Sequence, residues 1–356
     1  MIASLILPLY VSLLSLVFGY DEAEIVFAGD AMQHKAQLEA ARTGSGKYDY
    51  SQCFKEISGI IGCADYAVVN LETPVGPGPH SGYPCFNAPA EYVDALAEAG
   101  FDMFLTANNH TLDRGAKGLR STIRELDARG LDHVGTYSND SARTAALPKI
   151  VKVGSFRIGF LNYTYGTNGI EPRDGVVVDY IDRERIKNDV QAVRDAGAEL
   201  VAVCVHWGDE YKLLPNTAQR HLADFLEAIG VDMIIGGHPH VIQPMEFRKN
   251  RYHSDKDVAL VYSLGNFLSN MKTPDTRGGA MLHVGLFRGE DGIARLKEAS
   301  YSLVFSIAGN SVSDNFKLLE AGSVQTPLWK SRADEFGRRA RAIFDKHNIG
   351  VPERNR

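Results

Sequence analysis

The hydrophobic pattern alternates between short apolar runs and amphipathic segments. Six apolar runs are predicted to be strands: 24–29, 66–72, 101–107, 200–206, 233–237 and 258–264. Their apolar character is continuous, which is typical of strands that are covered on both faces. Four segments between them place apolar residues three and four apart and end in glycine, as helices commonly do: 89–100, 117–130, 184–197 and 216–230. This alternation predicts an α/β domain in which each helix returns the chain to the sheet.

Other segments follow a different pattern. Residues 156–166, 278–289 and 294–305 alternate apolar and polar positions and adjoin glycine-marked turns. This alternation predicts a mixed sheet with hairpins at its edges rather than a purely parallel one. A charged helical pattern at 333–348 is interpreted as a surface extension with no chemical role.

The first twenty residues carry no charge and form an apolar run about as long as a bilayer-spanning helix. A signal peptide that is cleaved near Gly19 and an uncleaved membrane anchor both fit this run. A buried helix is the third alternative, which Pro8 and the acidic residues at 21, 22 and 24 disfavour. We therefore expect an exported protein, in the periplasm or at the cell surface, with or without an N-terminal anchor.

Composition limits the function. The 356 residues are 44% hydrophobic and 23% charged, which suits one large globular domain or two modest ones. A formal net charge of -6 without a basic stripe argues against a nucleic-acid partner. The four cysteines lack the C-x-x-C spacing of a zinc knuckle or redox motif, and Cys204 lies in an apolar run that favours a buried thiol. In an exported protein, two of Cys53, Cys63 and Cys85 can pair, and the sequence does not choose among them.

Residues of metal-ligand type follow five of the apolar runs. They are Asp30 with His34, Glu72, the run Asn108, Asn109 and His110, then His206, and finally His238 with His240. The carboxyl ends of parallel strands meet at one edge of a sheet, so we expect these side chains to converge. Carboxylate, carboxamide and imidazole without thiolate suit Mn, Fe, Zn or Mg. Pairs of such ions activate water and clamp both oxygens of an in-line displacement, so this set serves phosphate-ester hydrolysis best.

Each of these residues also has a plainer alternative. Asp30 can cap a helix over 31–41, because a short acidic side chain accepts from helical N–H groups. Asn108 and Asn109 can fill a turn, where asparagine tolerates a left-handed backbone. His206, taken alone, fits a buried histidine with satisfied hydrogen bonds.

The pair His238 and His240 is harder to explain without a ligand. The two histidines flank a proline and follow Gly-Gly at the end of a buried strand, which favours metal or anion binding. Glu72 alone fits a surface carboxylate, although it directly follows an apolar run. If there were no metal centre, a separate plain explanation would have to be true at each of the five strand ends. The five positions together therefore indicate a metal centre.

Six sequence blocks resemble a known family: GDAMQH, NLETP, TANNHTLDRG, VHWGDEY, GGHPHVIQP and YSLGNF. Over about residues 24–305 the sequence resembles the calcineurin-like metallophosphoesterase superfamily. The closer resemblance is to its branch of bacterial capsule-synthesis proteins, the CapA or PgsA type involved in poly-γ-glutamate capsules. The resemblance implies a four-layer α/β/β/α sandwich of two mixed sheets with helices outside. The chain then divides into an N-terminal segment 1–20, this domain at 24–305, and a helical extension 306–356.

The resemblance also implies two divalent metal ions. It assigns Asp30 and His240 to the first ion, and Asn109, His206 and His238 to the second. These two groups of ligands are joined by a bridging carboxylate. That bridging position matches Glu72, where the wider superfamily has an aspartate with one methylene fewer. The superfamily's Asp-x-His block has Met32 in place of its histidine, so either His34 takes over that ligand role or the first metal is held weakly.

Further roles follow from the same blocks. His110 matches a histidine that does not bind metal but stabilises or protonates the leaving oxygen, which makes it the catalytic candidate. Arg114 and Asn108 are candidates for substrate binding, Arg114 because a guanidinium grips phosphate or carboxylate through two hydrogen bonds. Four more residues are expected to orient ligands or contact substrate: Asp113, Trp207, Glu210 and Asn266.

Three functions remain open from the sequence. The first is a metal-dependent hydrolase outside the cytoplasm, acting on a phosphoester or an anionic envelope-associated polymer. The second is a non-catalytic component of capsular polymer assembly or export, working with membrane-bound capsule synthesis partners. A nucleotidase or cyclic-nucleotide phosphodiesterase ranks third, because no segment marks a purine-stacking site. Metal content together with turnover separates the first two.

Overall fold

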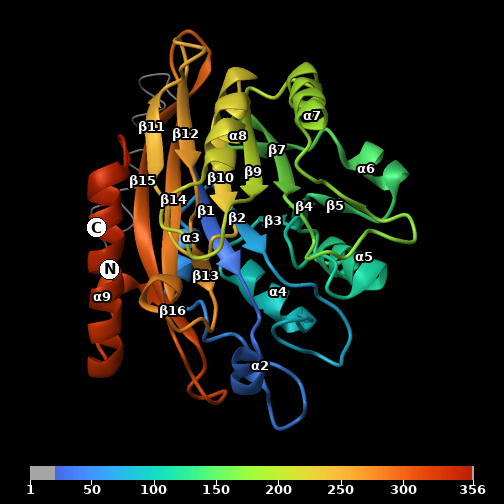
Figure 1. The fold of residues 1–356 in the computed structure, drawn as a ribbon, viewed down its shortest axis with the longest axis vertical. Helices are drawn as coiled ribbons and strands as arrows, with labels where there is room; N and C mark the ends of the chain where they lie inside the picture. Colours follow the sequence, from blue (N-terminus) through green and yellow to red (C-terminus); the bar gives the residue numbers. More distant parts are fainter. Residues whose placement is uncertain (1–20, 355–356) are drawn as a thin grey trace.

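Two β-sheets pack face to face, and helices cover their outer faces (Figure 1). The computed structural model describes residues 21–354 of the chain. The predicted signal peptide or anchor at residues 1–20 lies outside the described residues. Within 21–354, no helix is both long enough and apolar enough to cross a lipid bilayer.

The first sheet has eight strands. Its order is β16 (Lys317–Glu320), β15 (Ala294–Ile307), β14 (Gly278–Arg288), β1 (Asp21–Ala31), β2 (Tyr66–Leu71), β3 (Met103–Leu105) and β4 (Asp132–Val134), with β13 (Asn266–Leu268) also paired to β1. Strands β1 to β4 run parallel, whereas β14, β15 and β16 pair antiparallel. This sheet is therefore mixed, as the alternating segments predicted.

The second sheet has six strands and is also mixed. Its order is β11 (Met245–Lys249), β12 (Asp257–Val261), β10 (Met233–Gly237), β9 (Leu200–His206), β7 (Phe156–Thr164) and β6 (Ile150–Val153). The inner pairs are parallel, and antiparallel pairs β11–β12 and β6–β7 form both edges. A separate pair joins β5 (Thr136–Tyr137) to β8 (Val177–Val178).

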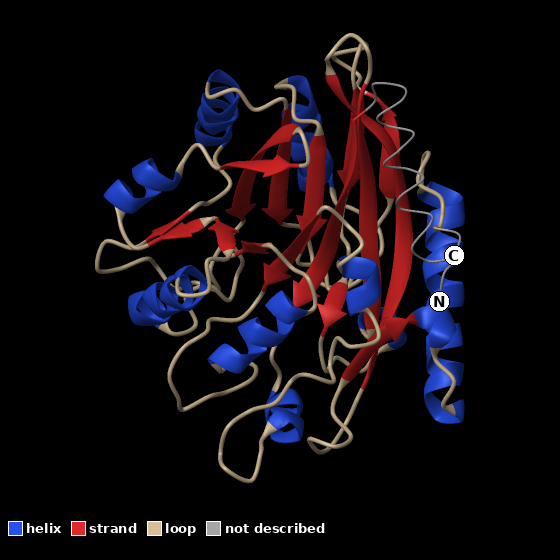
Figure 2. Ribbon diagram, turned by 180° about the vertical axis from the view of Figure 1, so that it is seen from behind, coloured by secondary structure: helices blue, strands red, loops and turns tan. Residues whose placement is uncertain are grey.

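Buried side chains of both sheets meet in one central core, for which Phe27 on β1 and Phe160 on β7 are examples, with ring centroids 6.4 Å apart. The outer face of the first sheet packs against α2 (Lys35–Ala41), α3 (Ser58–Ile61) and α4 (Ala90–Glu98). The second sheet packs against α7 (Arg183–Asp195) and α8 (Thr217–Ala228). Helix α5 (Gly115–Asp127) covers the β5–β8 pair, and α6 (Asp140–Ala146) follows β5. Figure 2 shows these layers from behind, and the expected four-layer sandwich is confirmed.

The four predicted helices are α4, α5, α7 and α8. The chain leaves each of them at a glycine with positive φ, in turn Gly100, Gly130, Gly197 and Gly230. Glycine enters this left-handed region without a steric penalty, so it ends a helix cheaply. The helix allowed over 31–41 is shorter than its pattern, because α2 begins only at Lys35 with His34 as its N-cap. Asp30 lies inside β1 and does not cap a helix.

The C-terminal segment is part of the packed fold, which corrects its interpretation as a surface extension. The boundary expected at residue 305 falls within β15, and β16 then joins the first sheet. Short 3-10 turns η1 (Pro274–Thr276) and η2 (Ala321–Ser323) adjoin α9 (Pro327–His347). Helix α9 lies beside β15 (Figure 1) and buries Phe336 and Phe344 in the central core. Its charged residues cover only the outward face, which explains the polar pattern.

The described cysteines are all free thiols. Cys53 and Cys204 are buried, Cys85 is half-buried and Cys63 is exposed. The buried position of Cys204 on β9 agrees with its apolar surroundings in the sequence.

Candidate metal centre

The ends of five strands meet between the two sheets. Asp30 lies opposite Asn70 where β1 pairs with β2, and His206 lies opposite Gly237 where β9 pairs with β10. The backbone N–H of His238 donates to Asp30 Oδ2 at 3.3 Å, which joins the end of the second sheet to that of the first. Figure 1 shows β1, β9 and β10 pointing toward the same side of the molecule. The convergence expected from the strand order is thus present in the fold.

Glycine allows this close approach. A Cβ on Gly237 would lie 2.9 Å from Asp30 Oδ1, and a Cβ on Gly29 would lie 2.0 Å from the carbonyl oxygen of Gly265. Both distances are shorter than real Cβ contacts. A larger residue at Gly29 or Gly237 would push the strand ends apart. With glycine at both positions, the backbone at Gly237 packs against the Asp30 carboxylate, and that at Gly29 packs against the carbonyl of Gly265.

His238 and His240 both adopt positive φ angles, 98° and 57° respectively. Non-glycine residues rarely occupy this region, and the backbone strain costs about 1–3 kcal/mol per residue. The surrounding contacts hold both histidines in these conformations. Strain of this kind is common where side chains are held for binding or catalysis.

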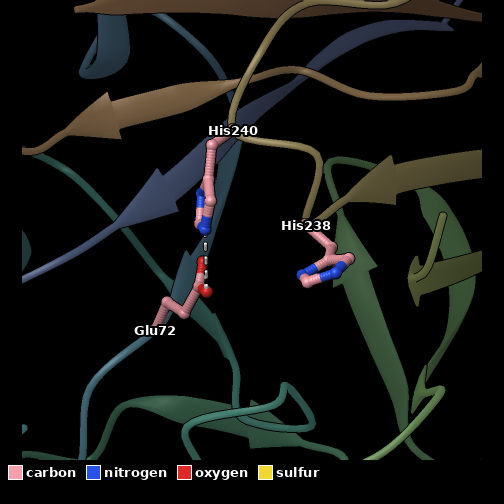
Figure 3. A group of neighbouring side chains, drawn as sticks. All are labelled: Glu72, His238 and His240. Atoms are coloured by element: carbon pink, nitrogen blue, oxygen red, sulfur yellow. Dashed lines mark ion pairs between the residues drawn. The ribbon is translucent and has the colours of Figure 1, made fainter. Parts of the chain in front are cut away.

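Glu72 lies at the centre of the group. Its Oε1 atom is 3.6 Å from His206 Nε2 and 3.8 Å from His240 Nε2, and Figure 3 shows His240 pointing at Glu72 with His238 beside them. Two sets of ligand atoms lie within 4.8 Å of one another: Glu72, His238 and His240 in one, and Asp30, Glu72 and His206 in the other. Glu72 is the only member that both sets share, as a bridging carboxylate would be, and this role stays a prediction. The sequence had grouped His206 with His238 and Asp30 with His240, so the assignment of ligands to individual ions stays a prediction.

Buried polar atoms without a hydrogen-bond partner show that the residues of these two ligand sets fit a cation. Glu72 Oε1 and His238 Nδ1 are both buried without a hydrogen-bond partner. Burial raises the pKa of Glu72 well above its ordinary value, and the neighbouring Asp30 adds to the effect. Burial also lowers the pKa of His206 well below its usual range and that of His238 to about 4, with nearby imidazoles adding to both shifts. A divalent cation would bind the lone pairs of the neutral imidazoles and would offset the repulsion between the neighbouring carboxylates.

Asn266 fixes the orientation of His240. The Nδ1 atom of His240 lies 3.0 Å from Asn266 Oδ1 and 3.3 Å from Asp30 Oδ2. Asn266 in turn donates through Nδ2 to the carbonyl of Thr276 at 2.8 Å, so its Oδ1 faces the ring. With Nδ1 holding the proton, Nε2 presents its lone pair toward Glu72. Of the two roles predicted for Asn266, orienting a ligand or contacting substrate, this contact favours the first.

Two amides complete the centre. Asn109 Oδ1 lies 2.9 Å from His206 Nε2, within the group where the sequence expected it. Asn70 Nδ2 donates to Asp30 Oδ1 at 2.8 Å and lies 3.5 Å from Glu72 Oε2. Asn70 had no predicted role. The signal was present, because alternate residues of a strand share one face and Asn70 stands two positions before Glu72.

His110 lies beside this centre and is held by Asp113. Its Nδ1 atom is 2.8 Å from Asp113 Oδ2, and both side chains are buried. The same carboxylate oxygen accepts the backbone N–H of Phe86, whose ring packs edge-on against His110 with centroids 4.6 Å apart. Asp113 therefore keeps the Nδ1 proton in place and leaves Nε2 for proton exchange.

Two predicted residues, His34 and Asn108, lie near the centre but use their side chains in other contacts. His34 belongs to neither ligand set; its Nδ1 lies 3.2 Å from Gln37 Oε1 at the start of α2. The Asn108 side chain donates to Leu71 O at 2.9 Å and to Asn70 Oδ1 at 3.3 Å, and it accepts from the backbone N–H of His110. A substrate role for Asn108 is therefore disfavoured, because both groups of its amide already have partners.

The remaining predicted residues flank the centre. Trp207 is buried under the outer helices, where its Nε1 donates to the carbonyl of Tyr262 at 2.9 Å, so it supports the strand rather than a ligand. Glu210 is exposed, and its charge raises the pKa of Glu72 after the effects of burial and Asp30. Arg114 contacts the loop that precedes Phe86, donating to Ser81 Oγ at 2.8 Å.

An aromatic rim that was not predicted from the sequence surrounds the histidines. Tyr165 lies 4.6 Å from His238, Tyr211 6.2 Å from His240 and Tyr83 6.5 Å from His110, measured between ring centroids. These three tyrosines, which we call the tyrosine rim, are 48%, 55% and 70% exposed. They come from three separate loops, so no local pattern linked them.

The sequence and structure match known proteins. The family model described as bacterial capsule synthesis protein PGA_cap matches residues 24–271. The chain is 29% identical over 282 residues to the PGA biosynthesis protein CapA of Bacillus subtilis (strain 168), across 76% of this chain and 69% of that protein. It is 27% identical over 277 residues to the capsule biosynthesis protein CapA of Bacillus anthracis, across 75% of this chain and 64% of that protein.

A solved structure supports the fold. The putative 5'-nucleotidase from Staphylococcus aureus in complex with alpha-ketoglutarate superposes with a TM-score of 0.50 at 16% identity, covering 89% of this chain and 58% of that chain. The likeness confirms the metallophosphoesterase-type sandwich and says nothing about substrate. Because the family model covers most of the described residues, the chain belongs to the bacterial capsule synthesis protein PGA_cap family.

Proposed function

We propose that this protein is a metal-dependent hydrolase of capsule biosynthesis. The observation that carries the proposal is the buried Glu72 oxygen that lacks a hydrogen-bond partner and faces His206 and His240. A carboxylate in that position stores unfavourable energy unless a cation joins the group. Two divalent ions held there would supply Lewis acidity and an activated water.

The side chains have separate tasks in this proposal. Asp30, Glu72, His206, His238 and His240 hold the cations through their carboxylate oxygens and imidazole nitrogens. His110 stands outside both ligand sets, so it is free to exchange a proton with the leaving oxygen through Nε2. Asp113 keeps that imidazole in the required tautomer and orientation.

Family membership supplies the biological setting. The relatives named for capsule or PGA biosynthesis support an anionic envelope-associated substrate, either the poly-γ-glutamate polymer or a phosphoester that belongs to its assembly. The uncharged first twenty residues support export to the periplasm or cell surface, with this segment as a cleaved signal or an anchor. Membrane-bound capsule synthesis proteins are the partners that such a location would provide.

The test is metal analysis and turnover of the full chain. We expect about two equivalents of Mn, Fe or Zn per chain, and metal-dependent hydrolysis of a generic phosphodiester or of γ-linked oligoglutamate. His110→Ala should lower turnover about 10²- to 10⁴-fold while metal content stays the same. A folded, metal-loaded protein that hydrolyses neither compound would refute catalysis.

A second candidate is a non-catalytic component of polymer assembly or export. Met32 favours it, because a buried thioether stands where the superfamily has a histidine, and its backbone carbonyl accepts from Gln37 and Tyr92. The first cation would then have one ligand fewer. Folded protein with at most one equivalent of metal and no turnover is the result that this candidate predicts.

A further inference from the structure

A cavity of about 500 Å³ opens beside the metal centre. Its walls come from α2, from the loop that contains residues 80–85, and from Arg114 at the start of α5. The residues that give it chemical character are Lys35, Arg42, Tyr48, His80, Tyr83 and Arg114. None of the proposed metal ligands lines it, so it is a separate compartment.

The cavity is cationic. Lys35, Arg42 and Arg114 carry positive charge, and Glu39 is the one acidic residue in its lining. Glu39 lies 3.7 Å from Lys35 in an exposed pair, which neutralises little in water. The chain as a whole has a net charge of -6, so a local excess of positive charge stands out against the rest of the surface.

Two nitrogen atoms in the cavity wall lack partners. Arg114 Nε and His80 Nδ1 are buried and make no hydrogen bond. The Nη2 atom of Arg114 donates to Ser81 Oγ and to the carbonyl of Pro79, both neutral acceptors. A buried guanidinium nitrogen without an acceptor is costly, and an anionic oxygen would relieve that cost.

The cavity walls are fixed against one another. A Cβ on Gly82 would lie 2.2 Å from the backbone nitrogen of Lys35, so this loop packs directly on the start of α2. His80 packs edge-on against Tyr48 with ring centroids 5.2 Å apart. None of these contacts involves Asp30, Glu72, His206, His238 or His240, so the walls of the cavity are held by contacts separate from the proposed metal ligands.

The cavity adjoins the catalytic candidate. Tyr83 lines it, and the Tyr83 ring lies 6.5 Å from that of His110. Cys85 also lines it and donates through Sγ to the carbonyl of Asp113 at 2.8 Å. A substrate segment in the cavity would therefore extend past Tyr83 toward His110.

We infer that this cavity is a subsite for a second anionic group of the substrate, a carboxylate or phosphate displaced from the bond that reacts. Lys35, Arg42 and Arg114 bind the anion, and Tyr83 packs against the connecting chain. The inference rests on the proposed function, because a subsite needs a substrate. A subsite for a second anionic group implies that the substrate is a polyanion with repeated acidic groups rather than a small ester with a single charge.

The test measures binding to metal-free, full-length protein by calorimetry. The probes are γ-linked hexaglutamate and inorganic pyrophosphate, which distinguish a carboxylate ligand from a phosphate ligand. The variant is Lys35→Gln with Arg42→Gln, both at exposed positions, and the control is Arg338→Gln, an exposed arginine on α9 outside the cavity. Circular dichroism verifies that each variant is folded.

We expect the double variant to bind the preferred probe about tenfold more weakly, and the control to bind like the wild type. Raising the salt concentration should weaken wild-type binding more than that of the double variant. Equal affinity in the double variant and the control, or no binding of either probe, would overturn the subsite. Because no metal is present, a failure to hydrolyse substrate would leave this result intact, and the two proposals can fail independently.

Discussion

His110 Nδ1 and Asp113 Oδ2 lie 2.8 Å apart, and both side chains are almost fully buried beside the metal centre. The two residues are three apart in sequence, so one turn of the chain sets their geometry. Asp113 makes no hydrogen bond to the proposed ligands; its carboxylate contacts His110 and the backbone N–H of Phe86, and its charge makes the smallest of the contributions that raise the pKa of Glu72. The pair can therefore be tested separately from metal binding.

Asp113→Asn should lower turnover about 10- to 100-fold without changing metal content, because the imidazole loses its fixed tautomer. Steady-state kinetics and elemental analysis of the same sample measure both quantities. The double variant His110→Ala with Asp113→Asn should be no slower than His110→Ala alone, since Asp113 acts through His110. Additive losses would show that Asp113 has an independent role.

Glu72→Gln should abolish binding of at least one cation, because both ligand sets contain Glu72. Removing a direct ligand should weaken metal binding by more than the roughly 10- to 100-fold caused by losing an outer contact. Calorimetric titration with Mn and Zn measures the change. Glu98→Gln, at an exposed position near the end of α4, is the matched control; wild-type stoichiometry in Glu72→Gln would contradict the bridging role.

Gly237→Ala should weaken metal binding although it changes no ligand. The added Cβ would meet Asp30 Oδ1 at 2.9 Å and push this carboxylate away from the histidines. Gly166→Ala is the control, since a Cβ there meets nothing within 4 Å. Metal titrations of the two variants should differ at least about threefold, because a clash at a ligand displaces it by tenths of an ångström. Equal metal affinities of the two variants would show that the Asp30 carboxylate can shift without loss of metal binding.

A buried ion cluster away from the site makes stability depend on pH. Glu227 on α8 is buried. Desolvation alone would raise its pKa, but hydrogen bonds from Arg248 and Arg251 outweigh that effect and lower the pKa to about 2. Glu246 and Asp224 pair with the outer sides of these arginines. A depressed pKa adds stability that is present above the unfolded value near 4.5 and is lost as the pH falls toward 2.

We expect Glu227→Gln to destabilise the protein by roughly 1–3 kcal/mol at pH 7. The difference from the wild type should shrink as the pH falls from about 4.5 toward 2, because the wild-type carboxylate then takes up a proton. Urea unfolding at several pH values measures it. A difference that stays constant across this range would mean that the charge of Glu227 is irrelevant.

The packing of α9 gives a stability test. Phe336 is buried against Phe305, with ring centroids 6.0 Å apart, whereas Leu328 on the same helix is 61% exposed. Phe336→Ala should cost about 3–5 kcal/mol in the free energy of unfolding, and Leu328→Ala less than about 0.5 kcal/mol. Chemical denaturation measures both. If both variants lost similarly little free energy of unfolding, the packing of α9 would contribute little to stability.

The sequence by itself determined the central strands, the four helices between them and the main ligand types. Continuous apolar runs and helical spacing are local properties, so these longer elements could be identified from their own residues. Asp30, Glu72, His206 and His238 stand where buried strands end, and the parallel arrangement of such strands brings their ends together. For that reason a metal centre could be predicted before any distance was known.

Only the tertiary structure decided which neighbours surround those ligands. Asn70 faces Asp30, His34 stays outside both ligand sets, and α9 is packed into the core rather than exposed. Tyr83 and the other rim tyrosines meet the histidines from separate loops. These relationships depend on contacts between segments far apart in the chain, which loops and sheet packing fix and which no local periodicity encodes.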